Sequence, residues 1–102
     1  MNKLSILGIF VADLAFFGKI PKVGETILGK KFVVGPGGKG SNQSVAAGKA
    51  GASVEFITKI GNDDYGKMAL KTYRETNVGI KNVFKSNDHS TGVAAILLDK
   101  ET

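Results

Sequence analysis

The sequence predicts an α/β domain with a small β accessory element. Short apolar runs typical of buried strands alternate with stretches of helical periodicity, and a second set of β-rich segments lies between the first strand and the first helix. With 102 residues, of which 42% are hydrophobic, the chain is at most one domain with a modest core. Fourteen glycines indicate many tight turns between these elements.

The first segment is an apolar run at residues 4–11, LSILGIFV. Its length and near-continuous hydrophobicity predict a strand that is buried on both faces at the centre of an α/β sheet. Asp13 follows this run, and open α/β sheets bind ligands beyond the carboxyl ends of their strands. The carboxylate is therefore a candidate ligand contact, although a turn or capping role explains it equally well.

Residues 16–34 predict a small antiparallel element that is separate from the parallel sheet. Pro21 and Gly24 mark a turn inside it. Residues 25–34 alternate imperfectly and indicate one or two short strands with a kink at Gly29. The glycine and proline cluster that follows is expected to end the element.

The middle of the chain predicts a helix and then a strand. The helix covers residues 41–50, with Ser41 as its N-cap and Gly51 in the left-handed position after its end. Residues 54–60 alternate with the period of a strand. One face of that strand is expected to carry Val54, Phe56, Thr58 and Ile60.

A second helix and further strands follow. The turn at residues 61–64 offers aspartates that can cap the helix, and residues 77–79 end it. Within the helix, Tyr65 and Tyr73 are expected at the edge of the core, not in a binding site. Short strands are indicated by Val83 and Phe84 and, more firmly, by residues 92–98; residues 99–102 look like the turn of a hairpin.

The sequence GGKGSNQ at residues 37–43 is the most informative motif of the chain. A glycine-dense turn leads into a helix rich in small residues, so a ligand can approach the backbone and the free N–H groups of the first helical turn. Lys39 and Asn42 add side-chain hydrogen-bonding groups at the same place. The segment is suited to hold a small polar molecule.

Composition excludes several classes of function. The net charge of +5 comes from scattered lysines and one arginine, without the clustered stripe that nucleic-acid binding needs. The absence of cysteine excludes disulfides and thiolate metal sites. His89, the only histidine, lies in a polar segment and is expected to be a solvated loop residue. Without a signal-peptide pattern or an apolar run near the length of a membrane span, a cytoplasmic location is expected, with neither nucleic acid nor membrane as a partner.

Taken together, these motifs resemble the N-terminal part of the ribokinase-like (PfkB-type) carbohydrate kinases, and GGKGSNQ resembles the ribokinase branch in particular. The further matches, in the same order along the chain, are Leu7-Gly8, Ala12-Asp13, Pro21, Gly24-Glu25-Thr26, Gly61-Asn62-Asp63, Tyr65-Gly66 and Ser90-Thr91-Gly92-Val93-Ala94. The resemblance covers essentially the whole chain. It implies part of a single kinase domain with a three-layer α/β/α sheet and a small antiparallel β lid, whose strands fall within about residues 14–36 and 90–99.

The resemblance also implies a sugar site. It assigns sugar contacts to Asp13, Gly38, Lys39, Asn42, Ala94 and Ile96. In this assignment the carboxylate accepts hydrogen bonds from sugar hydroxyls, the glycine brings its backbone close, and the lysine and asparagine donate. The two residues of the returning lid strand cover the apolar side of the sugar.

The family's remaining functional motifs are absent from these residues. In the family, the ATP site, the magnesium-organising residues and the catalytic base lie further along a much longer chain, so the resemblance assigns no catalytic residue here. It implies ATP and Mg²⁺ as cofactors of the full-length enzyme, leaves K⁺ open, and leads us to expect that the isolated chain is inactive. Residues 37–40 are not a nucleotide-binding P-loop, because the spacing of that motif is missing.

One departure from the family concerns the substrate. Val11 stands where ribokinases usually carry an asparagine that touches the sugar, so ribose is in question and a deoxy sugar, a polyol or a nucleoside becomes more plausible. The alternatives to a kinase fragment are a non-catalytic lid, dimerisation or sugar-binding module and a truncated remnant. The resemblance also implies a lid homodimer, which we expect to use Phe16, Phe17, Ile27, Phe32 and Val33.

Overall fold

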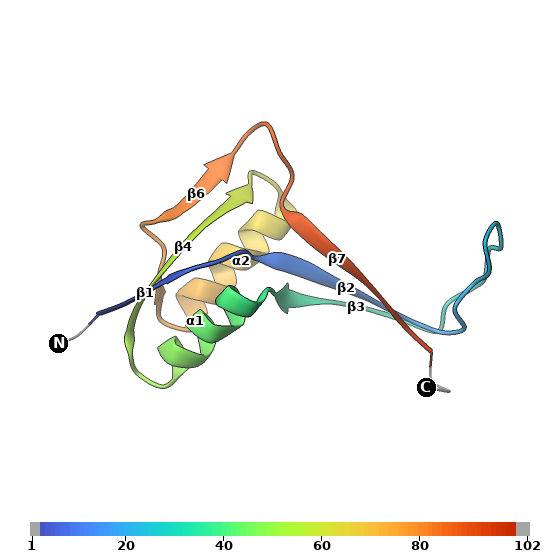
Figure 1. Ribbon diagram of the computed structural model, residues 1–102, viewed down its shortest axis with the longest axis horizontal. Coiled ribbons are helices and arrows are strands. Elements are labelled where there is room, and N and C mark those ends of the chain that lie inside the picture. Colours follow the sequence, from blue (N-terminus) through green and yellow to red (C-terminus); the bar gives the residue numbers. More distant parts are fainter. Residues whose placement is uncertain (1–2, 100–102) are drawn as a thin grey trace.

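The computed structural model describes residues 3–99, so part of the hairpin turn expected at residues 99–102 lies outside the described residues. The elements are β1 (Lys3–Leu7), β2 (Val11–Phe17), β3 (Lys31–Gly37), α1 (Lys39–Lys49), β4 (Ser53–Gly61), α2 (Asp64–Glu75), β5 (Val78–Gly79), β6 (Val83–Ser86) and β7 (Gly92–Leu98). They form a core of four strands and two helices, from which a three-stranded sheet projects (Figure 1). The predicted α/β fold class is confirmed.

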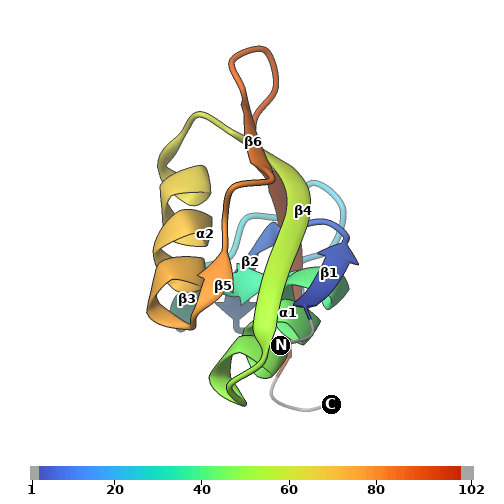
Figure 2. The ribbon, with the colours of Figure 1, turned by 90° about the vertical axis from the view of Figure 1, so that its left-hand side faces the viewer.

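Strand β4 organises the core sheet, and all its pairings are parallel. It pairs with β1 on one side and with the short β5 on the other (Figure 2), while β6 pairs with its last four residues. The predicted alternation is confirmed, because every second residue from Val54 to Ile60 is buried.

Both helices pack against this buried face of β4. The ring of Tyr73 in α2 lies edge-on to Phe56, with the ring centroids 5.4 Å apart. α1 also lies close to this ring, because a Cβ atom added to Gly40 would be 3.4 Å from the nearest ring atom of Phe56. In the described part of the chain no helix covers the opposite face, where Leu7 is 79% exposed.

The N-terminal apolar run does not form the single central strand that we expected. β1 ends at Leu7, residues 8–10 belong to no strand, and β2 begins at Val11 in a different sheet. The run is apolar throughout because Phe10, in this connection, is buried in the core with 3% exposure. Within residues 3–99, β1 is an edge strand paired only with β4, and Leu4 at its start is 48% exposed.

The projecting sheet, called the lid below, has the strand order β3-β2-β7. Strands β2 and β3 are antiparallel, as expected, but β7 is parallel to β2. The reason is visible in Figure 1: β2 and β7 both run from the core toward the tip of the lid, and only β3 returns. The assignment of about residues 14–36 and 90–99 to the lid, and of the rest of the chain to the core, stays a prediction.

Strand β3 differs from the sequence-based expectation. It begins only at Lys31, and residues 25–30 belong to no strand. It then continues through Gly35 and Pro36, which we expected to end it. Because β3 pairs only with β2 among the described residues, its outer edge needs no N–H donor, and an edge strand tolerates proline there.

The helix ends are set by different devices. α1 begins at Lys39 after Gly38, which offers no side-chain cap, so the expected N-cap role of Ser41 is wrong. The capping role expected in the 61–64 turn is confirmed, because the Asp63 carboxylate accepts a hydrogen bond of 2.8 Å from the Gly66 N–H. Gly51 has a φ of 92°, the left-handed conformation expected after α1.

Ser41 instead joins the two helices. Its hydroxyl forms a 2.8 Å hydrogen bond with the hydroxyl of Tyr73, and both residues are fully buried. Tyr73 also packs edge-on against Phe10 and Phe56, so it belongs to the centre of the core and not to its edge. Burial raises the pKa of the Tyr73 hydroxyl to about 12, which keeps it protonated at neutral pH.

We expect Tyr73→Phe to lower the free energy of unfolding by about 1–3 kcal/mol, because the Ser41 hydroxyl loses its partner in the core. Adding Ser41→Ala should cost less than the sum of the two single changes. Urea denaturation measures both effects. Tyr65→Phe is the control, since the Tyr65 hydroxyl has no hydrogen bond among the described residues; an equal loss in the control contradicts the assignment.

Candidate functional site

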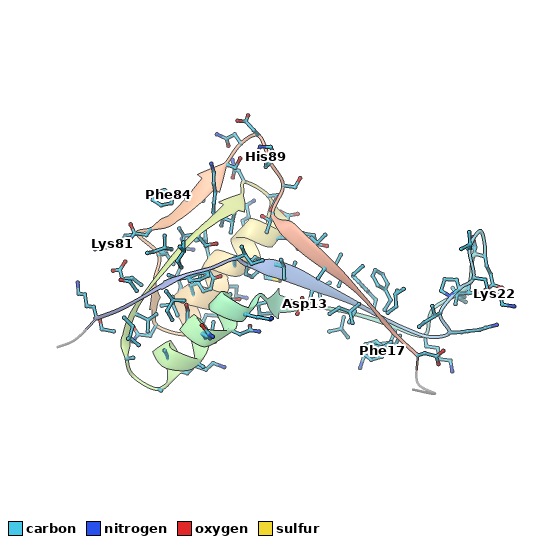
Figure 3. The ribbon with its side chains drawn as sticks, viewed as in Figure 1. Asp13, Phe17, Lys22, Lys81, Phe84 and His89 are labelled. Atoms are coloured by element: carbon cyan, nitrogen blue, oxygen red, sulfur yellow. The ribbon has the colours of Figure 1, made fainter. Side chains whose placement is uncertain are left out.

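Asp13 lies at the base of the lid, where β3 leads into α1 (Figure 3). It is the third residue of the central lid strand β2, not a residue of the turn after β1. Its neighbours across the sheet are Gly35 in β3 and Ala94 in β7, whose side chain shares its face. No side chain of the described residues forms a hydrogen bond or ion pair with the Asp13 carboxylate, so its oxygens are free to accept bonds from a ligand.

Gly37 gives the Asp13 carboxylate its place, a role that the sequence analysis missed. A side chain on Gly37 would collide with all three atoms of the carboxylate group. Gly38 has a different role: its φ of 100° and its contact with the Ile9 carbonyl oxygen leave no room for a side chain. The adjacent glycines in the sequence signal a close approach, but not which glycine faces Asp13.

The first turn of α1 follows Gly38 directly. The Asn42 N–H donates to the Gly38 carbonyl at 2.8 Å, so the earlier N–H groups of the helix have no partner inside it. Lys39 and Asn42 are exposed and, three residues apart, lie on one side of the helix. No acidic residue lies in this turn, so the site combines one carboxylate with several donors.

Ala94 and Ile96 complete the set of predicted site residues. Ala94 is the sheet neighbour of Asp13, and Ile96 is the neighbour of Ala15, one row nearer the tip of the lid. Both are partly buried and lie on the face of the lid that carries Asp13. The structure therefore brings Asp13, the glycine turn and Ala94 together at the base of the lid, while the sugar contacts assigned to them stay a prediction.

Other candidate features lie away from this place. His89 is exposed in the loop after β6, as expected, and its backbone N–H donates to the Ser86 hydroxyl at 3.1 Å (Figure 3). Residues 3–99 contain no group of three histidine, aspartate or glutamate side chains that could hold a metal ion. They also contain no helix with the length and hydrophobicity to cross a membrane.

Comparison with known proteins decides the family. The profile of the pfkB family carbohydrate kinases matches residues 1–102. The chain belongs to the pfkB family of carbohydrate kinases. Among its relatives, the ribokinase of Bacillus subtilis is 37% identical over 99 residues, covering 96% of this chain and 34% of the relative. The deoxyribokinase of Salmonella typhimurium is 33% identical over 97 residues, covering 94% of this chain and 32% of the relative.

Solved structures agree with this assignment. The ribokinase of Arabidopsis thaliana, solved with ribose and ATP, matches this pfkB-family chain with a TM-score of 0.89 and 30% identity. The match covers 96% of this chain and 32% of that protein. The chain thus spans about a third of the length of the relatives it matches.

We expect Gly37→Ala to lower the free energy of unfolding by about 1–3 kcal/mol, because the new methyl group displaces the Asp13 carboxylate. Asp13→Ala should remove most of this cost, since it removes the atoms with which the methyl group collides. Gly35→Ala in the same strand is the control, because a side chain there meets open space. Urea denaturation of Gly37→Ala, Asp13→Ala, the double variant with both changes, and Gly35→Ala checks this, and equal costs at residues 35 and 37 contradict the contact.

Proposed function

We propose that this chain forms the sugar-binding side of an ATP-dependent kinase that phosphorylates a hydroxyl of a ribose-like sugar. The observation that carries the proposal is the Asp13 carboxylate, held over Gly37 beside the first turn of α1. Relatives named ribokinase and deoxyribokinase, and the ribose complex of the Arabidopsis ribokinase, support this class of substrate.

In this proposal each site residue has a distinct part in holding the sugar. The Asp13 carboxylate accepts hydrogen bonds from two neighbouring hydroxyls, and the Gly38 backbone lies close to the sugar. Lys39 and Asn42 donate to hydroxyl oxygens from the first turn of α1. The small and apolar side chains of β7 cover the carbon skeleton and exclude water as the site closes.

The groups of the described residues do not fit a site for the nucleotide or for Mg²⁺. The described residues provide no cluster of metal-ligating side chains, and the Gly37–Gly40 turn lacks the spacing of a P-loop. We therefore assign no ATP, Mg²⁺ or K⁺ contact to the described residues, propose these groups as cofactors of the full-length enzyme, and expect the 102-residue chain alone to transfer no phosphate. A cytoplasmic location also stays a prediction.

Val11 bears on which sugar is accepted. It lies two residues before Asp13 in β2, on the same face of the lid, beside Gly37 and Gly92. A valine there cannot donate to a sugar hydroxyl, whereas an asparagine can. This observation favours a sugar that lacks a hydroxyl at that point, such as 2-deoxyribose, over ribose.

The test begins with the intact mass of the gene product in its source cell. That product is then purified and assayed with ATP, Mg²⁺ and a pentose panel headed by ribose and 2-deoxyribose. We expect phosphorylation by a longer product and none by the 102-residue chain. Asp13→Asn should weaken sugar binding at least tenfold, about the effect of one lost hydrogen bond to a charged group.

Val11→Asn refines the same assay. We expect it to shift the ratio of kcat/KM for ribose over 2-deoxyribose upward by about fivefold, the size of one gained neutral hydrogen bond. Unchanged preference would remove Val11 from the site. Sugar binding without phosphate transfer by the native product would instead favour the non-catalytic module.

A second proposal concerns the other face of the lid, which we infer to pair with the same face of a second copy. This apolar face begins in the core at Ala12, which is fully buried, and continues outward along β2 to Phe16, which is 41% exposed. The ring of Phe32 lies against that of Phe16, with 4.9 Å between the centroids. The exposed residues that share the face are Phe16, Phe32, Val34, Val93 and Leu97.

Strand alternation revises the residues that we expected in such a dimer. Phe17 and Val33 lie on the Asp13 face of the lid, so they cannot belong to the same apolar surface as Phe16 and Phe32. Ile27 lies in the loop between β2 and β3. The dimer proposal therefore rests on the apolar face alone, the face of the lid opposite Asp13, where a contiguous apolar patch favours association.

We expect Phe32→Asp to convert a dimer into a monomer, because it places a charge on the apolar face beside Phe16. Sedimentation velocity over a range of concentrations measures this. Leu28→Asp is the control, since Leu28 is 97% exposed in the loop and lies outside that face. A wild-type protein that is monomeric at all concentrations rules the dimer out.

A further inference from the structure

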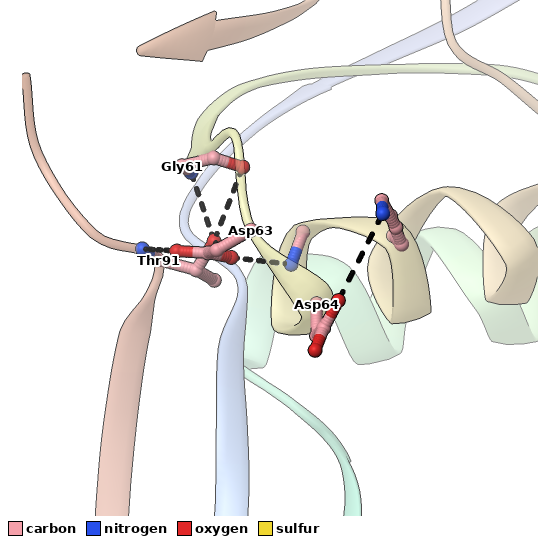
Figure 4. A network of polar contacts seen from close by, with 6 residues as sticks. Gly61, Asp63, Asp64 and Thr91 are labelled. Carbon is pink, nitrogen blue, oxygen red and sulfur yellow. Dashed lines mark hydrogen bonds and ion pairs between the residues drawn. The ribbon is translucent and has the colours of Figure 1, made fainter. Parts of the chain in front are cut away.

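A polar cluster joins the end of β4, the start of α2 and the start of β7 (Figure 4). The Asp63 carboxylate accepts three hydrogen bonds in it: 2.8 Å from the Gly66 N–H, 2.8 Å from the Thr91 N–H and 2.6 Å from the Thr91 hydroxyl. The Thr91 hydroxyl in turn accepts a 2.8 Å bond from the Gly61 N–H. One carboxylate therefore holds together segments that are far apart in the sequence.

The charge of Asp63 strengthens this cluster. The bonds from the Thr91 hydroxyl, the Thr91 N–H and the Gly66 N–H hold the pKa of the Asp63 carboxyl below its ordinary value. The group is therefore ionised at neutral pH, and hydrogen bonds to a carboxylate are shorter and stronger than those between neutral groups.

Thr91 has little freedom to move. It is 5% exposed, and its backbone nitrogen would lie 2.5 Å from a side chain on Gly61. A side chain on Gly66 would collide with the Gly61 carbonyl oxygen, so the turn itself is closely packed. The cluster therefore fixes the position of Thr91, the residue that precedes β7.

This position bears on the site at the base of the lid. Gly92, the next residue, pairs with Val11, and Ala94 pairs with Asp13. The other two connections between core and lid, residues 8–10 and Gly38, are packed against each other through the Ile9 carbonyl group. The third connection runs through Thr91 and depends on Asp63.

We propose that Asp63 is a positioning residue for the sugar site, acting through Thr91 on β7 and so on the placement of Ala94 and Ile96 opposite the sugar. The inference rests on the proposed function and deepens it. Asp63 touches neither the sugar nor a reacting atom. Its contribution is to hold one wall of the site in place.

Two variants separate this role from the capping of α2. Thr91→Val keeps the size of the side chain and the backbone N–H bond but loses the hydroxyl, and it leaves the cap untouched. Asp63→Asn removes the charge but keeps a residue that caps helices as well as aspartate does. Thr91→Ser retains both bonds and is the conservative rescue.

Thr72→Val is the matched control. The Thr72 hydroxyl donates to the Met68 carbonyl within α2 at 2.9 Å, so the control also loses a hydrogen-bonded threonine hydroxyl, but away from the lid. Each variant is introduced into the native gene product, at the length that its intact mass shows. The measurements are KM for the sugar, KM for ATP, the unfolding midpoint, and hydrogen exchange of the β7 amides.

We expect Thr91→Val and Asp63→Asn to raise KM for the sugar about tenfold while KM for ATP stays constant, the effect of one hydrogen bond to a charged group. Thr91→Ser should restore the wild-type value, and Thr72→Val should change neither KM. Amides of β7 should exchange faster in Thr91→Val than in Thr72→Val. Equal sugar KM in the Thr91→Val and Thr72→Val proteins overturns the proposal.

Failure of the proposed function gives a different result. If the wild-type product binds no pentose of the panel, the sugar assignment fails and hydrogen exchange alone decides the role of Asp63. Faster exchange along β7 in Thr91→Val than in Thr72→Val then supports the positioning of this strand by Asp63, and equal exchange refutes it.

Discussion

The close approach of backbone segments where the lid joins the core is the constraint on which the candidate site depends. The Cβ of a side chain on Gly8 or on Gly40 would lie 3.0 Å from the Cα of the other, so the connection after β1 and the start of α1 fit together only because both residues lack a side chain. Beside them, Gly38 packs on the carbonyl of Ile9. These contacts determine where β2 leaves the core and where α1 begins, and Asp13 lies between the two.

The sequence predicted the parts of the fold that depend on local periodicity. The alternation along β4 and the capping role of Asp63 were correct, because each follows from a few neighbouring residues. The run at residues 4–11 was misread, since hydrophobicity does not distinguish one continuous strand from a strand followed by a connection with Phe10 in the core. Ser41 was misread as a cap because its partner, Tyr73, is 32 residues away.

The candidate site shows the same division. Asp13 and the glycine turn could be identified from residue type and spacing, since both are local features. The placement of Ala94 beside Asp13 follows from the β2–β7 register, and periodicity does not predict register between segments about 80 residues apart. The contact of Gly37 with the carboxylate and the bonds from Thr91 to Asp63 likewise needed coordinates.

The Ser41–Tyr73 hydrogen bond and the Asp63 cluster differ in how their contribution to stability depends on pH. The Ser41–Tyr73 bond is neutral and fully buried, so it holds the helices together without dependence on charge near neutral pH. The Asp63 cluster combines an ionised group with a buried threonine. Stability from a carboxylate whose pKa is lowered by folding is present at neutral pH and is lost as the pH falls through that lowered pKa.

Pro36 has a consequence for the way in which copies of the lid can meet. It lies in β3, an edge strand of the three-stranded sheet, and proline has no N–H to offer a neighbouring strand. A further strand added along this edge would lack one backbone hydrogen bond at Pro36. Natural sheets use proline in edge strands in this way to prevent edge-to-edge polymerisation. Growth of the sheet from one molecule to the next is thereby disfavoured on this side, which leaves stacking of faces as the better route to a closed assembly.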